Sequence, residues 1–134
     1  MIAVQLRLVG GVLVLLGVAH VVLPRALAWP DEFRRLTPLT RQVMYLHTFS
    51  IGVVCVLAGL PPLVLTTDLL AGGRLGTALL AGQCLFWGLR WAAQFVAFRP
   101  ALWRTSRLYT AGHVGFALLW TWIVGVFATA LAVS

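Results

Sequence analysis

Acidic residues are scarce in this sequence, and lysine is absent. The chain of 134 residues has Asp31, Glu32 and Asp68 against ten arginines, which gives a formal net charge of +7. One glutamate is too few for a carboxylate-bridged di-iron centre, which needs several glutamates and Glu-x-x-His pairs on facing helices. The arginines stand at the ends of apolar runs and form no basic stripe with stacking aromatic residues. We therefore expect no nucleic-acid partner.

Cysteine and the short motifs of soluble enzymes are also scarce. Cys55 and Cys84 lie in separate apolar segments and form no C-x-x-C pair, which excludes the four-span quinone reductases that use such a dithiol. The sequence has no glycine-rich phosphate loop, no nucleophile elbow and no Cys–His pair. Hydrolase or nucleotide chemistry of the soluble type therefore finds no support.

Apolar residues dominate what is present. They make up 61% of the chain, charged residues make up 10%, and the mean hydropathy is +0.98. A domain of this size has too much surface to bury so many apolar residues away from water, so lipid is the expected solvent. The sequence predicts an all-α integral membrane protein, an up-and-down four-helix bundle in which residues 1–134 form a single domain. Spans of at least about 20 residues are needed, and we place them at residues 2–23, 42–65, 75–98 and 108–133.

Prolines and glycines mark the expected connections. Pro24 is predicted to end the first helix, the segment Pro61–Gly73 is predicted to turn after the second, and Pro100 is predicted to end the third. Within the first connection, the stretch WPDEFRRL predicts one or two turns of interfacial helix, with Pro30 at its first position and acids in the first turn.

The arginines predict the orientation. Seven of them lie in the first and third connections, at one membrane face, whereas Arg7 and Arg74 lie toward the other. The positive-inside rule places the arginine-rich face in the cytoplasm and both termini in the periplasm of a bacterial inner membrane. Anionic lipids are the expected partners of that face.

Five polar residues share one predicted depth. His20 is near the end of the first span, His47 is near the start of the second, Arg90 and Gln94 are near the end of the third, and His113 is near the start of the fourth. Up-and-down threading brings all five to the cytoplasmic leaflet. Ionisable residues within a membrane are costly and usually functional, so these residues form the candidate site.

Three kinds of ligand suit these residues. His20, His47 and His113 could hold a transition metal with an open position. His47 and His113 could ligate haem b, with Arg90 paired to a propionate. Arg90, Gln94 and a histidine could instead hold an anionic or quinone-like ligand.

A plainer interpretation is that the cluster only packs helices. Histidines near an interface often bond to backbone or water, and an arginine can extend its head group to the membrane surface. Aromatic residues at the span ends are typical of a membrane-interface belt and receive no functional weight; these are Trp29, Trp91, Trp103 and Tyr109.

Three segments carry a family resemblance. The first span, LRLVGGVLVLLGVAHVVLP, resembles the opening of DoxX-like four-span membrane proteins, with a Gly-x-x-His formed by Gly17 and His20 and a proline at Pro24. RQVMYLH and LFWGLRWAAQF resemble a set of uncharacterised bacterial four-span proteins, and together the segments cover about a third of the chain. The resemblance implies four spans, a role for His20, and an association with oxidoreductase complexes as a small membrane subunit.

Two functions follow as hypotheses. The first is an inner-membrane protein whose His/Arg/Gln site binds a metal, haem or redox-active ligand. The alternative is a non-catalytic structural or assembly subunit of a larger membrane redox complex. In either case the chain is expected to meet membrane partners or further copies of itself.

Overall fold

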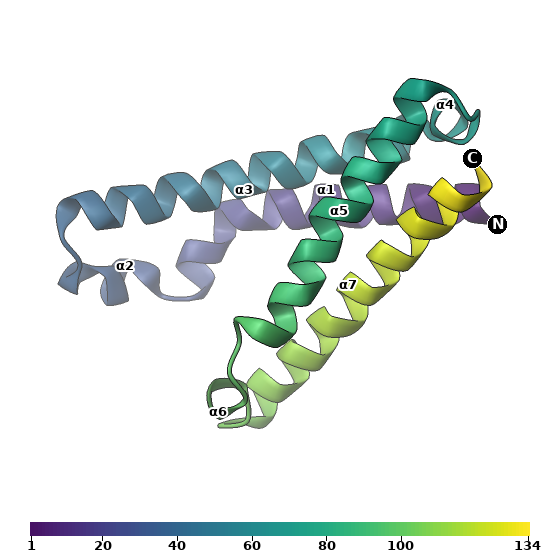
Figure 1. Cartoon of the computed structure of the whole chain (residues 1–134). Helices are drawn as coiled ribbons and strands as arrows, with labels where there is room; N and C mark the ends of the chain where they lie inside the picture. Colours follow the sequence, from purple (N-terminus) through teal and green to yellow (C-terminus); the bar gives the residue numbers. More distant parts are fainter. The chain divides into compact units, whose positions relative to one another are not determined.

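A computed structural model describes residues 1–134, and every regular element in it is a helix. Four long helices are joined by short helical turns (Figure 1). The long helices are α1 (Ile2–Ala26), α3 (Pro38–Val64), α5 (Arg74–Val96) and α7 (Arg107–Val133); the short ones are α2 (Trp29–Glu32), the 3-10 helix η1 (Phe33–Arg35), α4 (Thr66–Leu70) and α6 (Pro100–Trp103). The predicted all-helical fold is confirmed.

The chain divides into two compact units. The N-terminal unit is Arg7–Leu65, and the C-terminal unit is Thr66–Ser134 together with Met1–Leu6. α1 therefore contributes its first residues to the C-terminal unit and the rest of its length to the N-terminal unit. Each unit is described by itself, and the packing of all four long helices into one bundle stays a prediction.

Three of the long helices, α1, α3 and α7, are long and apolar enough to cross a membrane. They have 25, 27 and 27 residues, and at about 1.5 Å per residue each exceeds the roughly 30 Å of a bilayer's hydrocarbon. The predicted membrane character is supported to this extent. α5 has 23 residues and also has the length, but Arg74, Arg90 and two glutamines make it less apolar.

The prediction that Pro24 ends the first helix was wrong, because α1 continues to Ala26. α3 runs through Pro61 and Pro62 to Val64, which agrees with the predicted span end at residue 65, so the turn predicted for Pro61–Gly73 begins only after Val64. A proline removes one backbone donor from a helix, but neighbouring bonds persist, as when Leu65 N donates to Pro61 O at 2.8 Å. A bilayer would favour a continuous helix further, because the backbone there has no water to bond instead. The third helix does end before its proline, since α5 stops at Val96 and Pro100 begins α6.

The first connection forms the helical turns predicted for WPDEFRRL. α2 and η1 follow Ala28, whose positive φ of 54° turns the chain after α1. Asp31 and Arg34 form an ion pair at 3.2 Å. Arg41 at the start of α3 donates from Nε to the Phe33 carbonyl at 3.2 Å. The Arg41 bond ties the connection to α3.

Two pairs of glycines bring α1 and α3 into backbone contact in the N-terminal unit. A Cβ atom added at Gly17 would lie 2.5 Å from the carbonyl oxygen of Gly52, and one added at Gly10 would lie 2.6 Å from the carbonyl oxygen of Gly59. The pairs are seven residues apart in each helix and run in opposite order, so the two helices are antiparallel and touch along one stripe. Any side chain at these positions would separate them.

α5 and α7 form the centre of the C-terminal unit. Trp87 stacks on Trp120 with ring centroids 5.5 Å apart, and the Trp91 indole donates to Thr121 at 2.8 Å. Gln94, which follows Trp87 on α5, meets His113, which precedes Trp120 on α7, so the two helices are antiparallel. α6 connects them along the chain. At the other end, the Trp122 indole donates to Gln5 at 2.9 Å, which ties the first residues of α1 to this unit.

Candidate ligand-binding site on α5 and α7

Arg90, Gln94 and His113 form a chain of hydrogen bonds across the α5–α7 contact. Arg90 donates from a guanidinium nitrogen to Gln94 Oε1 at 3.2 Å, and the Gln94 side-chain nitrogen lies 3.0 Å from His113 Nδ1. Gln94 is almost fully buried, whereas Arg90 and His113 are half-buried. We call these three residues the relay. The structure therefore brings together three of the five residues predicted from the sequence.

The direction of donation through the relay follows from the chemistry of arginine. A guanidinium can only donate, so the Gln94 atom facing Arg90 must be its amide oxygen. The amide nitrogen of Gln94 then faces His113 and donates to Nδ1. Since Nδ1 accepts this bond, the neutral imidazole carries its proton on Nε2. The relay thus presents N–H groups and no exposed lone pair.

Aromatic rings enclose the two ends of the relay. The indole of Trp103 is stacked on the His113 imidazole, with centroids 4.3 Å apart and planes 4° from parallel. The Arg90 guanidinium carbon lies 4.8 Å from the centre of the Trp120 ring and 5.8 Å from that of Phe98. Such cation–π contacts stabilise a guanidinium away from water. They also explain how α5 accommodates an arginine on its apolar length.

Trp103 corrects the sequence analysis, which treated it as an ordinary interface residue. Its contact with His113 depends on α6 folding back toward α7, and Thr110 supports that fold by donating to the Trp103 carbonyl at 2.9 Å. No periodicity links a residue on a four-residue helix to one on the next helix. The only sequence signal was closeness to His113 along the chain.

Trp120 is the second aromatic residue with an unusual setting. It is 6% exposed, and its indole Nε1 is buried without a hydrogen-bond partner. Its neighbour Trp87 is satisfied, because its indole donates to Gln83 at 2.8 Å. Buried polar atoms normally find partners, so Trp120 is a further donor beside Arg90.

The other two predicted site histidines belong to the N-terminal unit. His20 is half-buried on α1, with Nδ1 2.6 Å from the Leu16 carbonyl oxygen, and His47 is exposed on α3. Both belong to the N-terminal unit, whereas His113 belongs to the C-terminal unit. A metal site shared by the three histidines, and haem ligation by His47 and His113, therefore stay predictions.

The relay's chemistry favours one of the three ligand classes. A metal or haem iron binds the lone pair of an unprotonated imidazole nitrogen. In neutral His113, Nδ1 already accepts from Gln94 and Nε2 carries the proton. Neither unit contains a group of three or more histidine, cysteine, aspartate or glutamate residues arranged to hold a metal ion. The relay is better suited to a ligand whose oxygen atoms accept hydrogen bonds.

Comparisons with known proteins identify no family for this chain. No protein-family model, no curated protein and no solved structure gives a significant match to the chain. The resemblance to DoxX-like proteins remains an expectation, and function is inferred from the residues themselves.

Proposed function

We propose that this protein crosses the bacterial inner membrane four times and binds an anionic or quinone-like ligand at the relay. The observation that carries the proposal is the Arg90→Gln94→His113 order of donation. In its neutral form, His113 at one end of the relay then offers Nε2–H, and Arg90 at the other end offers a permanently charged guanidinium. A carbonyl or carboxylate oxygen is the complementary group.

The surroundings of the relay support a flat, largely apolar ligand. Trp103, Phe95 and Phe98 lie around His113 and Arg90, and they offer ring surfaces with few competing polar atoms. Ligand sites of this type combine aromatic walls with a few fixed polar groups. A quinone has both features, since its carbonyl oxygens are acceptors and its ring is planar. We therefore assign the redox-active ligand expected from the sequence to the quinone class.

Ligand titration tests the proposal. In detergent, a short-chain benzoquinone is expected to quench tryptophan fluorescence saturably, because Trp103 and Trp120 flank the relay. His113→Ala and Arg90→Lys are each expected to weaken binding about tenfold or more, because the loss of a charged or buried hydrogen bond is equivalent to at least 1.4 kcal/mol. Lysine keeps the charge of Arg90 but loses the planar contact with Trp120.

Matched variants control for general effects. His47→Ala and Arg99→Lys change an exposed histidine and an exposed arginine, and both should bind as the unmodified protein does. Decanoate, titrated in parallel, separates a preference for anions from one for quinone carbonyls. Equal binding by all four variants would refute the proposal. A Soret band or stoichiometric metal in the purified protein would favour the metal or haem interpretation instead.

A structural or assembly subunit is the second candidate. The observation favouring it is that the Gln94–His113 bond joins α5 to α7, and that both polar atoms of the Gln94 side chain have partners within the protein. Under this interpretation, His113→Ala costs only stability, on the order of 1 kcal/mol for a lost interhelical hydrogen bond, and no ligand is bound. Thermal unfolding of the same variants distinguishes the two functions.

The proposed orientation has its own test. We expect alkaline phosphatase fused after Ser134 to be active, because seven arginines in the first and third connections hold the opposite face in the cytoplasm. The same enzyme inserted after Arg104 should be inactive. The reverse pattern would show that the membrane orientation is inverted, and activity at both positions would show that α7 does not cross.

A further inference from the structure

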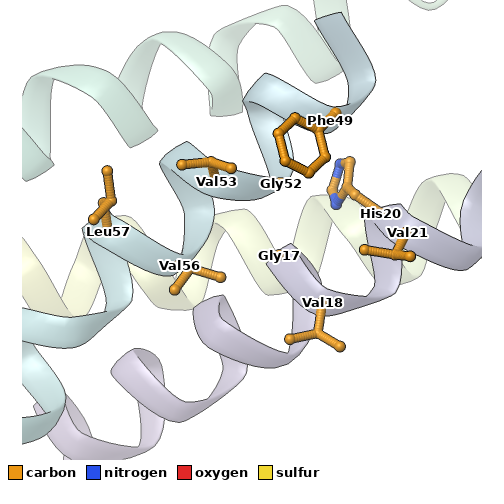
Figure 2. A pocket seen from close by; sticks show the side chains of 9 residues that line it. All are labelled: Gly17, Val18, His20, Val21, Phe49, Gly52, Val53, Val56 and Leu57. Atoms are coloured by element: carbon orange, nitrogen blue, oxygen red, sulfur yellow. The ribbon is translucent and has the colours of Figure 1, made fainter. Parts of the chain in front are cut away.

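A pocket on the N-terminal unit lies outside the relay and contains the remaining half-buried histidine. Its volume is about 240 Å³, and it lies between α1 and α3. Its lining includes His20, Val21, Phe49 and Val56, together with Gly17 and Gly52. Figure 2 shows the His20 imidazole at one end of the pocket, beside the ring of Phe49. Apart from His20, no residue of the lining has a polar side chain.

The glycines create this pocket. A Cβ atom added at Gly52 would lie 2.9 Å from His20 Cβ, and one added at Gly17 would lie 2.6 Å from a methyl carbon of Val56. Either addition would push side chains into the space or separate the helices. Gly17 and His20 are the residues of the Gly-x-x-His sequence, so the close helix contact and the histidine are positioned by one turn of α1.

The single polar atom offered to the pocket is an acceptor. His20 Nδ1 lies 2.6 Å from the Leu16 carbonyl oxygen, which can only accept, so Nδ1 carries a proton. In the neutral imidazole the lone pair is then on Nε2. This is the opposite tautomer to that of His113. The Leu16 bond satisfies Nδ1 only. Nε2, the second nitrogen of His20, still faces the apolar lining of the pocket.

We infer that this pocket binds a hydroxyl group carried on an apolar ring, with the hydroxyl donating to His20 Nε2. The apolar lining takes the ring, Phe49 offers it a flat surface, and one acceptor matches one donor. In a membrane, two sources have this chemistry: a lipid-soluble phenol, including a reduced quinone, and a polycyclic aliphatic alcohol. The inference concerns the N-terminal unit alone and does not depend on the relay.

The experiment compares probes that differ in one feature. The full chain, labelled with ¹⁵N-histidine and placed in lipid nanodiscs, is titrated with 2-naphthol, its methyl ether 2-methoxynaphthalene, and the saturated alcohol 2-decalol. We expect 2-naphthol to shift the His20 Nε2 resonance and to bind several-fold to about tenfold more tightly than the ether, as one hydrogen bond predicts. If 2-decalol binds as tightly as 2-naphthol, a hydroxyl on any apolar ring is sufficient for binding. If 2-decalol binds more weakly, the pocket prefers a phenol.

Two variants separate the pocket from the rest of the protein. His20→Phe keeps a ring of similar size but removes the acceptor, so its preference for 2-naphthol over the ether should disappear. His113→Ala should leave that preference unchanged, which makes failure here distinguishable from failure at the relay. The inference is overturned if His20 Nε2 does not respond in the unmodified chain, if the ether binds equally well, or if His20→Phe retains the preference. The first two outcomes are measured on the unmodified chain, so they do not depend on whether a variant folds.

Discussion

Replacing Gln94 with glutamate is expected to move the proton of neutral His113 from Nε2 to Nδ1. Glutamate has the shape of glutamine but both its oxygens only accept. A glutamate at position 94 would stay in place through an ion pair with Arg90, four residues earlier on α5. Its carboxylate could then bond to His113 only by accepting a hydrogen bond from Nδ1–H. The relay would then lose its Nε2–H donor, so we expect benzoquinone affinity to fall by about tenfold or more.

The proton can be located by ¹⁵N NMR, because protonated and unprotonated imidazole nitrogens resonate in well-separated regions. Gln83→Glu is the matched control. Gln83 is also on α5, but its Oε1 accepts from the Trp87 indole at 2.8 Å, and a carboxylate can do the same. The control should leave His113 and the affinity unchanged. An unaltered His113 spectrum in Gln94→Glu would mean that the relay does not set the tautomer.

Replacing Gly17 with leucine is expected to disrupt the N-terminal unit. The new Cβ would lie 2.5 Å from the Gly52 carbonyl oxygen and 3.0 Å from the Val56 amide nitrogen. Because these atoms belong to the backbone, a rotamer change cannot relieve the contact, and α1 and α3 must separate. We expect a loss of at least 2–3 kcal/mol, in the upper range for overpacked sites. The His20 pocket should be lost with it.

Gly11→Leu provides the comparison, since a Cβ atom at Gly11 would meet no atom within 4 Å. Both changes raise the helix propensity and apolar surface of α1 by the same amount, so only the contact with α3 differs. Thermal unfolding in detergent, followed by size-exclusion chromatography, measures the difference. Similar melting temperatures for the two variants would contradict the close α1–α3 contact.

Part of the site followed from helical periodicity. Arg90 and Gln94 are four residues apart, so a helix places them on one face, and the hydrogen bond between them needs only α5 to form. The convergence of α5 with His113 required one further assumption, that the two helices are antiparallel neighbours. The short connection between them, which contains Pro100 and two arginines, makes that assumption reasonable. Both expectations agree with the structure of the C-terminal unit.

Other features depended on contacts between elements that no period describes. Trp103 reaches His113 because α6 folds back on α7, and the tautomer of His113 depends on Gln94, which meets its Nδ1 from α5. The prediction that Pro24 ends a helix was wrong for a related reason. It considered only the backbone donor that a proline removes, whereas neighbouring backbone bonds and the absence of competing water decide whether a helix continues.

Composition and periodicity by themselves determined that this protein is helical and apolar enough to enter a membrane, because 61% apolar residues cannot be buried within 134. They also placed an arginine and a glutamine on one face of α5. Only the tertiary structure decided that neutral His113 is a donor at Nε2. The physical reason is that an imidazole has two nearly equivalent protonation sites, and a single hydrogen bond from Gln94, on another helix, selects between them.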